Sequence, residues 1–227
     1  MNASDTSNDY GLHDEPVGSG NHEVRQGECV SSIADATGHF WEKLWNLSAN
    51  RELREIRKDP NALLPGDLIE VPEIEPGEHA GATEKRHRFR RKGVPSVLKL
   101  QVLRLGEPVA DKPFTLDVDG HLIRGSTDAQ GRIEESIPPG ARAAKLVVDN
   151  DGEDIRYDIE IGTLDPIDTT TGIKARLRNL GFDPGPIDRA DRPEYRAALA
   201  AFQERWELEK TGNPDQKTRD KLKELSK

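Results

Sequence analysis

The sequence has a single cysteine, Cys29, and few aromatic residues, which make up 5% of its 227 residues. One cysteine excludes a disulfide within the chain and suits folding in a reducing compartment. No run of residues approaches the ~18 apolar residues of a membrane-spanning helix. The first 21 residues have neither a basic start nor an apolar stretch. We therefore expect no Sec signal peptide, and a disordered tail over residues 1–22.

An excess of positive charge is also missing. The net charge is −9 and the isoelectric point is near 5.3, which argues against nucleic acid as the main partner because phosphate binding needs a cationic face. The length leaves room for two or three small domains. Changes in composition favour three domains, at residues 23–72, 85–162 and 163–227, with a linker over 73–84. The fold class we predict is a multidomain α+β protein.

Residues 23–72 carry the pattern of a βααβ module. A short strand starting at Val24 leads to a turn at Gly27, and a Pro-Gly turn leads to a second strand over residues 68–71. Between them, two amphipathic helices are predicted by apolar residues at offsets of three and four, namely Val30, Ile33 and Ala34, then Trp41, Leu44 and Trp45. Helical spacing explains the tryptophans, so we expect core packing rather than sugar stacking. Residues 50–60 are expected to form a charged connection.

The runs V-R-Q-G-E-C-V-S-S-I-A and L-L-P-G-D-L-I-E-V-P resemble a LysM domain, a module that binds N-acetylglucosamine polymers such as peptidoglycan and chitin. The resemblance implies a glycan-binding groove between the loop after the first strand and the loop before the second. The residues it assigns to this groove are Gly27, Glu28, Cys29, Val30, Asn61, Ala62, Leu63 and Leu64. Cys29 stands where this family often has threonine. The alternative is that these residues maintain the fold without binding sugar.

A basic cluster follows the linker on this otherwise acidic chain. Six of the eight residues from 85 to 92 are cationic: Lys85, Arg86, Arg88, Arg90, Arg91 and Lys92. Such a cluster suits an anionic polymer or an acidic protein surface. The alternative is a solvated edge strand whose charges prevent pairing between sheet edges.

Residues 96–162 alternate apolar and polar residues, which predicts about six strands in an antiparallel β-sandwich. The sequence Asp119-Gly120 is a hairpin signal, and residues 128–131 form another turn signal. The pattern resembles the small sandwich repeats of bacterial surface and secreted proteins. Several aspartates could bind calcium, but no 12-residue ligand loop is present, so we interpret them as surface charge.

The C-terminal segment predicts a three-helix bundle. Its first helix ends at Gly181, its second runs from Pro193 to Trp206, and its third is preceded by Asp215 as an N-cap signal. The motifs R-L-x-x-L-G-F, G-x-I-D, A-L-x-x-F-Q and T-G-x-P-D-x-x-T resemble the three-helix peptidoglycan-binding domain of cell-wall enzymes. The sequence departs from that family after Asp188, beside the groove that the resemblance implies.

We expect no enzymatic activity. The only cysteine lies in the LysM-like segment, the six histidines form no H-E-x-x-H motif, and there is no G-x-S-x-G. The Ser96 to Lys99 spacing matches S-x-x-K, but in a strand an offset of three places the two side chains on opposite faces. All three segments are occupied by small non-catalytic folds. We therefore expect no cofactor and no metal.

These features predict a non-catalytic adaptor that binds bacterial peptidoglycan or another N-acetylglucosamine-containing glycan. The arrangement, including K-R-H-R-F-R-R-K-G-V-P and L-D-P-I-D, also resembles proteins associated with bacterial type VI secretion systems. That resemblance implies synthesis in the cytoplasm and delivery to the periplasm or a target cell by a secretion machine. The alternative function is an assembly component or effector-loading adaptor of a contractile injection machine, whose LysM fold binds a spike or effector protein rather than glycan.

Overall fold

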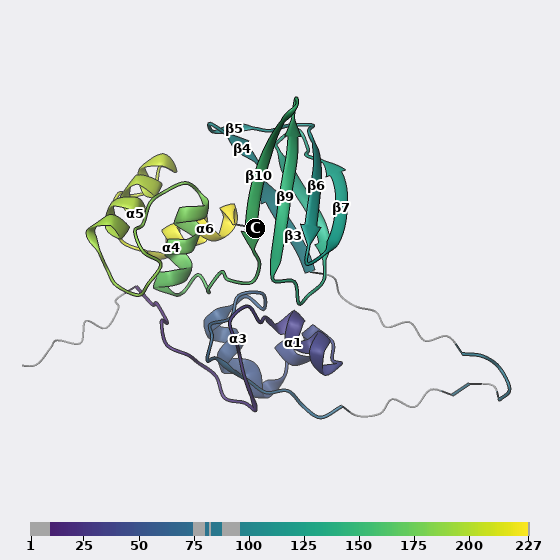
Figure 1. The fold of residues 1–227 in the computed structure, drawn as a ribbon. Coiled ribbons are helices and arrows are strands. Elements are labelled where there is room, and N and C mark those ends of the chain that lie inside the picture. Colours follow the sequence, from purple (N-terminus) through teal and green to yellow (C-terminus); the bar gives the residue numbers. More distant parts are fainter. Residues whose placement is uncertain (1–9, 75–79, 82, 88–95, 227) are drawn as a thin grey trace, which may run out of the picture. The chain divides into compact units, whose positions relative to one another are not determined.

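The computed structural model describes residues 10–74, 80–81, 83–87 and 96–226 of the chain (Figure 1). These residues divide into two compact units, each made of chain segments that are far apart in the sequence. The first unit comprises residues 10–29, 49–69 and 161–226, and the second comprises the described parts of residues 30–48 and 70–160. Among the described helices, none is long and apolar enough to cross a membrane.

The first unit begins with a short antiparallel ribbon. Strand β1 (His22–Glu23) pairs with β2 (Leu68–Ile69), with His22 opposite Ile69 and Glu23 opposite Leu68. Helix α3 (Arg51–Arg57) precedes β2, after the 3₁₀ turn η1 (Ser48–Asn50). We expected residues 50–60 to be a connection, but α3 forms there because Leu53 and Arg57, one helical turn apart, are both buried. Lys58 ends the helix in the left-handed conformation, with φ of 58°.

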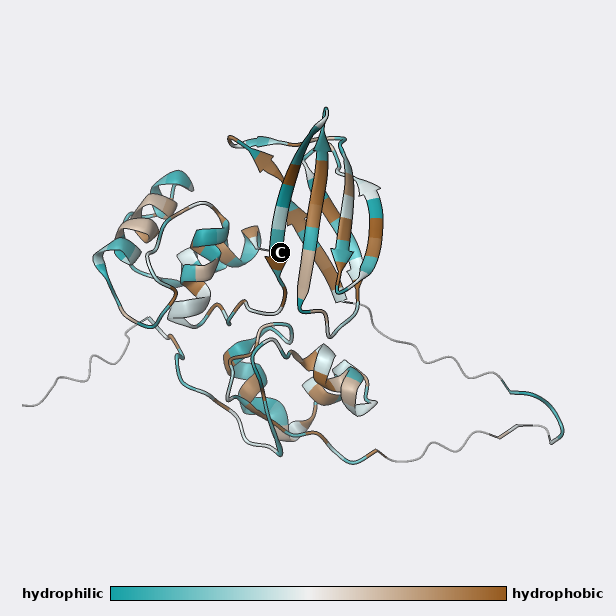
Figure 2. Ribbon diagram, in the orientation of Figure 1, coloured by the Kyte–Doolittle hydropathy of each residue, from teal (hydrophilic) through white to brown (hydrophobic). Residues whose placement is uncertain are grey.

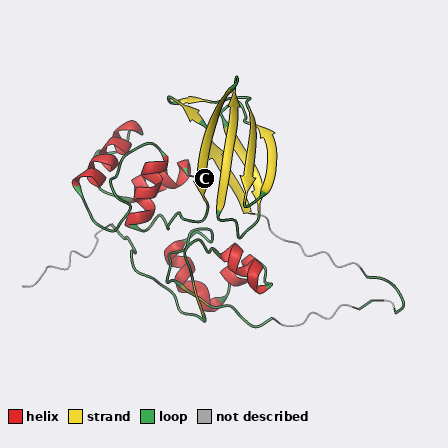
Figure 3. Ribbon diagram, in the orientation of Figure 1, coloured by secondary structure: helices red, strands yellow, loops and turns green. Residues whose placement is uncertain are grey.

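This unit also contains the predicted set of three C-terminal helices: α4 (Thr170–Asn179), α5 (Pro193–Arg205) and α6 (Gln216–Leu225) (Figure 3). The side chains of Thr169 and Asp215 cap α4 and α6 by accepting bonds from Gly172 N and Thr218 N. The shared core contains Ile173, Leu177, Tyr195, Ala198, Leu199, Phe202 and Leu222. Trp206, which the sequence placed at the end of the second helix, follows the last turn of α5 and is 36% exposed.

The N-terminal segment, residues 10–21, also belongs to the first unit. The sequence predicted a disordered tail over residues 1–22, whereas residues 10–21 run alongside other parts of this unit. The backbone N–H of Leu68 donates to Val17 O over 2.9 Å, and that of His13 donates to Asp168 O over 2.6 Å. Low hydrophobicity predicted disorder here, but backbone and carboxylate hydrogen bonds hold the segment in place. Residues 1–9 lie outside the described part of the chain.

The second unit contains the helices α1 (Val30–Thr37) and α2 (Trp41–Trp45). The predicted apolar stripes are buried: Val30, Ile33 and Ala34 on α1, and Leu44 and Trp45 on α2. Trp41 is half-buried. The element order between β1 and β2 is thus α1, α2, η1 and α3, one helix more than expected.

The strands of the second unit follow in sequence. They are β3 (Ser96–Gln101), β4 (Leu103–Arg104), β5 (Glu107–Pro108), β6 (Pro113–Val118), β7 (His121–Ser126), β8 (Arg132–Ile137), β9 (Ala143–Asn150) and β10 (Glu153–Glu160). Four of them form an antiparallel sheet in the order β10-β9-β6-β7, while β3 pairs with β8 and β4 with β5. Hydrophobic residues are frequent along β6 and β9 (Figure 2), and burial alternates along both strands, where Phe114, Leu116 and Val118 and then Ala144, Leu146 and Val148 are buried. The hairpin at Asp119-Gly120 joins β6 to β7 as the sequence predicted.

Candidate functional site

The loop between α4 and α5 is built around a buried lysine. Lys174 on α4 has no exposed surface, and its ammonium Nζ donates to the carbonyls of Pro186, Asp188 and Ala190 at 3.3, 2.9 and 2.6 Å. Nζ also contacts the carboxylate Oδ1 of Asp188 at 3.0 Å. Backbone carbonyls and one carboxylate therefore surround the cation, and these bonds hold residues 186–190 against α4.

Asp188, the last residue of the G-x-I-D motif, holds the far side of the same loop. Its two carboxylate oxygens accept from Arg192 Nη1 at 2.6 and 2.7 Å, and Oδ1 also accepts from the backbone N–H of Ala190. The hydrogen bonds from Arg192 and Lys174 lower the pKa of Asp188 well below its ordinary range. The carboxylate is therefore ionised at neutral pH and fixed in direction.

The loop between α5 and α6 is organised by one buried amide. Gln203 on α5 is fully buried, and its Nε2 donates to Thr211 Oγ1, Asn213 O and Thr218 Oγ1 at 3.0, 3.0 and 2.9 Å. Its Oε1 accepts from Gly212 N at 2.8 Å. The glutamine of the A-L-x-x-F-Q motif thus shapes the loop that carries the T-G-x-P-D motif. These motif residues act as the scaffold of the loops rather than as their exposed surface.

Arg196 connects the two loops on the outside of the module. Its guanidinium bonds the carboxylate of Asp191 at 2.5 Å in the first loop and Asn213 Oδ1 at 3.3 Å in the second. The side chains of Arg196 and Asp191 are 57% and 53% exposed. We name Asp191, Arg196 and Asn213 the α5 loop surface. Its guanidinium, carboxylate and amide groups can exchange hydrogen bonds with hydroxyl and amide groups of a polar ligand.

The residues assigned to a LysM-like groove differ in accessibility. Since β1 and β2 are antiparallel, residues 25–29 and 61–67 leave the same end of the ribbon, and Gly66 N donates to Val24 O at 2.8 Å. Asn61 is exposed, and Glu28 and Cys29 are partly exposed. The side chains of Ala62, Leu63 and Leu64 are buried, and so is Val30, which begins α1 in the second unit. Ligand contact to the buried positions would be limited to the backbone.

Gly27 and Glu28 form the turn after β1. Gly27 has φ of +83°, which glycine adopts without strain. A Cβ atom on Gly162 would lie 2.8 Å from Gly27 O, so residue 162 lies directly against this turn. Burial opposes ionisation of Glu28, but bonds from Arg25 N at 2.9 Å and the His22 ring at 3.0 Å outweigh it and lower the pKa of Glu28.

Of the basic cluster, Lys85 and Arg86 are exposed. Arg88, Arg90, Arg91 and Lys92 lie outside the described residues. Within the part of the chain that the structure describes, no group of three histidine, cysteine, aspartate or glutamate side chains could hold a metal ion.

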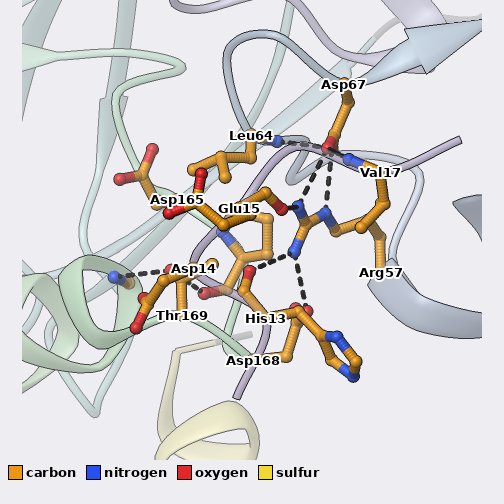
Figure 4. A network of polar contacts seen from close by, with 12 residues as sticks. His13, Asp14, Glu15, Val17, Arg57, Leu64, Asp67, Asp165, Asp168 and Thr169 are labelled. Carbon is orange, nitrogen blue, oxygen red and sulfur yellow. Dashed lines mark hydrogen bonds and ion pairs between the residues drawn. The ribbon is translucent and has the colours of Figure 1, made fainter. Parts of the chain in front are cut away.

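Sequence reasoning missed Arg57, the most densely bonded side chain of the first unit. Its guanidinium is fully buried between Asp67 and Asp168, at 2.9 and 2.8 Å (Figure 4). The available signal was Arg57 four residues after Leu53 on the apolar face of a short helix. The partner Asp168 lies 111 residues away, so spacing could not identify it.

Comparison with known proteins identifies one segment. Neither the curated proteins nor the solved structures yielded a match to this chain. Residues 170–222 match the family model described as "Putative peptidoglycan binding domain", a stretch that contains all of α4 and α5 and most of α6. The C-terminal three helices are therefore similar to a peptidoglycan-binding domain, and peptidoglycan is the ligand that this similarity supports.

Proposed function

We propose that this protein is a non-catalytic adaptor that binds bacterial peptidoglycan through its C-terminal three helices. The observation that carries the proposal is the family match over residues 170–222, in which Lys174 and the motif residues Asp188 and Gln203 fix two loops. The loops place the α5 loop surface in solvent. Its exposed polar groups suit the hydroxyl and amide groups of a glycan strand and its peptides.

Residues 23–72 supply a second glycan site in this proposal, through a LysM-like module. The support is the sequence resemblance, together with paired strands whose loops leave the same end of the β1–β2 ribbon. The exposed candidate contacts there are Glu28, Cys29 and Asn61. We interpret the two main sheets of the second unit as the layers of a small β-sandwich with no ligand of its own.

The proposal includes no wall-cleaving reaction. Its support is the lack of a recognisable nucleophile or zinc-binding motif in the sequence. We expect the purified protein to release no soluble fragments from peptidoglycan, with or without added metal. If the protein did release soluble fragments and one carboxylate substitution abolished that release, the protein would be an enzyme and this part of the proposal would be wrong.

The binding test is co-sedimentation with purified peptidoglycan sacculi. Arg196→Ala should weaken binding about tenfold, since it removes the guanidinium and the link between the two loops. Arg205→Ala is the matched control, because Arg205 is exposed on the same helix and makes no hydrogen bond or ion pair with the described residues of either loop. The site assignment would be wrong if both variants sediment like the unchanged protein, and the function would be wrong if the unchanged protein does not sediment.

A second candidate function is favoured by the basic cluster, of which Lys85 and Arg86 are exposed. Six cations in eight residues suit an acidic surface, such as a spike or effector protein of a secretion machine. Delivery by such a machine would take the protein from the cytoplasm to the wall. Replacing Arg86, Arg88, Arg90 and Arg91 by glutamine should then reduce salt-sensitive capture of the acidic partner and leave sacculus binding intact.

A further inference from the structure

We propose that Arg57 and the N-terminal segment join the β1–α3–β2 region to the three C-terminal helices, so that the two candidate wall-binding regions bind as one rigid body. This inference rests on the proposed function for its biological meaning, but its structural content can be tested without a ligand. Residues 70–160 are then an insertion in the sequence between the two regions, which are connected by contacts within the first unit.

Arg57 is the centre of the junction. It donates from Nε and Nη2 to the two oxygens of Asp67, at 2.9 Å each, and from Nη1 to Asp168 Oδ2 at 2.8 Å (Figure 4). Its Nη1 and Nη2 also donate to the backbone carbonyls of His13 and Glu15, at 2.8 and 2.9 Å. All five guanidinium N–H groups therefore have an acceptor. The acceptors come from three separate stretches of the chain.

Asp67, directly before β2, links Arg57 to the backbone beside the β1–β2 ribbon. Its carboxylate is fully buried and accepts from the backbone N–H groups of Val17 and Leu64 at 2.8 and 2.9 Å, in addition to Arg57. Burial would lower the pKa of Arg57, but the hydrogen bonds and charges of Asp67 and Asp168 outweigh it and raise that pKa. Arg57 therefore stays charged at any physiological pH.

The N-terminal segment makes an independent contact with the C-terminal helices. Asp14 accepts from Thr170 N at 2.6 Å and from Thr170 Oγ1 at 2.8 Å, at the first turn of α4. A carboxylate there satisfies a free amide and interacts favourably with the helix dipole. Gly162, which precedes α4 in the chain, lies against Gly27 and adds a third contact within the first unit.

Rigidity follows from the cost of breaking these contacts. Separation of the two regions would break the buried pair of Arg57 with Asp168 and the bonds of Asp14 to Thr170, and it would leave one guanidinium N–H of Arg57 without its acceptor. Buried polar pairs of this kind also favour one orientation over others. A fixed spacing between two weak sites raises the affinity for a polymer with matching repeats and leaves the affinity for a short fragment unchanged.

The first experiment measures the distance distribution between spin labels at Glu52 and Lys210, both exposed and in the two regions. The unchanged protein should give one narrow distribution. Asp14→Ala combined with Asp168→Ala should broaden it, since the two substitutions remove the α4 contact and one acceptor of Arg57 while leaving the Asp67 pair in place. Asp158→Asn, exposed on β10, is the control and should give the narrow distribution. A broad distribution in the unchanged protein overturns the inference.

The second experiment compares binding to sacculi with binding to short soluble peptidoglycan fragments. The double variant should lose about tenfold or more in affinity for sacculi and stay within about twofold for fragments. If the unchanged protein binds sacculi and the variant keeps the same ratio of polymer to fragment affinity, the coupling is wrong. If the unchanged protein shows the narrow distance distribution but binds neither material, the proposed function fails and the rigid junction stands.

Discussion

Lys174 places a positive charge inside the C-terminal helices, and all the hydrogen bonds of its ammonium go to the loop between α4 and α5. Its ammonium contacts three carbonyls and the Asp188 carboxylate, and it lies 5.1 Å from the centre of the Tyr195 ring. Together with the Asp188–Arg192 pair, this side chain fixes the shape of the loop. The residue therefore matters to any ligand surface that includes Asp191.

We expect Lys174→Met to destabilise the three helices by about 2–4 kcal/mol, because it leaves buried carbonyls without a donor. Urea denaturation followed by circular dichroism measures the change. The control is Lys217→Met, on the exposed face of α6, which should stay within about 0.5 kcal/mol of the unchanged protein. Equal stability of the two variants would contradict this role for Lys174.

The pH dependence of stability should show the contribution of the ionised Asp188 carboxylate to the fold. Bonds from Arg192 and Lys174 lower its pKa in the folded state below the ordinary value of 3.8. The carboxylate therefore stabilises the fold above about pH 4, and this contribution is lost as the pH falls below 3.8 toward the folded-state pKa. Asp188→Asn should give a lower melting temperature at pH 7 and a smaller loss between pH 5 and pH 2. The same slope in both proteins would disprove the assignment.

At the scale of an element, one hairpin in the second unit differs from its neighbours. The turns at Asp119-Gly120 and Asp151-Gly152 have positive φ at both residues, and the turn at Leu105-Gly106 has the same pattern, with φ of 52° and 88°. Aspartate tolerates the left-handed conformation, whereas leucine is disfavoured there. Leu105 is also fully exposed, so burial does not compensate the backbone strain.

We therefore expect Leu105→Asp to stabilise the second unit by about 0.5–1 kcal/mol, measured by urea denaturation. The matched control is Leu122→Asp, also an exposed leucine but in strand β7 with ordinary φ, which should give no gain. If both substitutions stabilise equally, removal of exposed apolar surface rather than relief of backbone strain is the cause.

Local patterns predicted the elements far better than the contacts between them. The spacing of Ile173 and Leu177, or of Phe114 and Leu116, reports one buried face, and that information lies within a few residues. Helix α3 was missed because its stripe contains a buried arginine in place of an apolar residue. The Arg57–Asp168 pair was out of reach because either residue, taken alone, has the pattern of an exposed charge.

At the scale of the whole molecule, the division into two units predicts two unfolding transitions in scanning calorimetry. Leu116→Ala should lower the temperature of one transition and Leu199→Ala that of the other, since each leucine is fully buried in a different unit. Each substitution should cost about 2–5 kcal/mol. A single transition that both variants lower equally would show that the units unfold together.

The first unit consists of chain segments that are synthesised at very different times. Asp14 emerges 156 residues before its partner Thr170, and Tyr10 emerges 209 residues before Arg219, which donates to its carbonyl. The sheet β10-β9-β6-β7, in which two of the three pairings join neighbours in sequence, can form while α4 is still being synthesised. Synthesis thus leaves Arg57 and Asp67 without Asp168 until the second unit is complete, and the nascent first unit depends on its last-made residues to close.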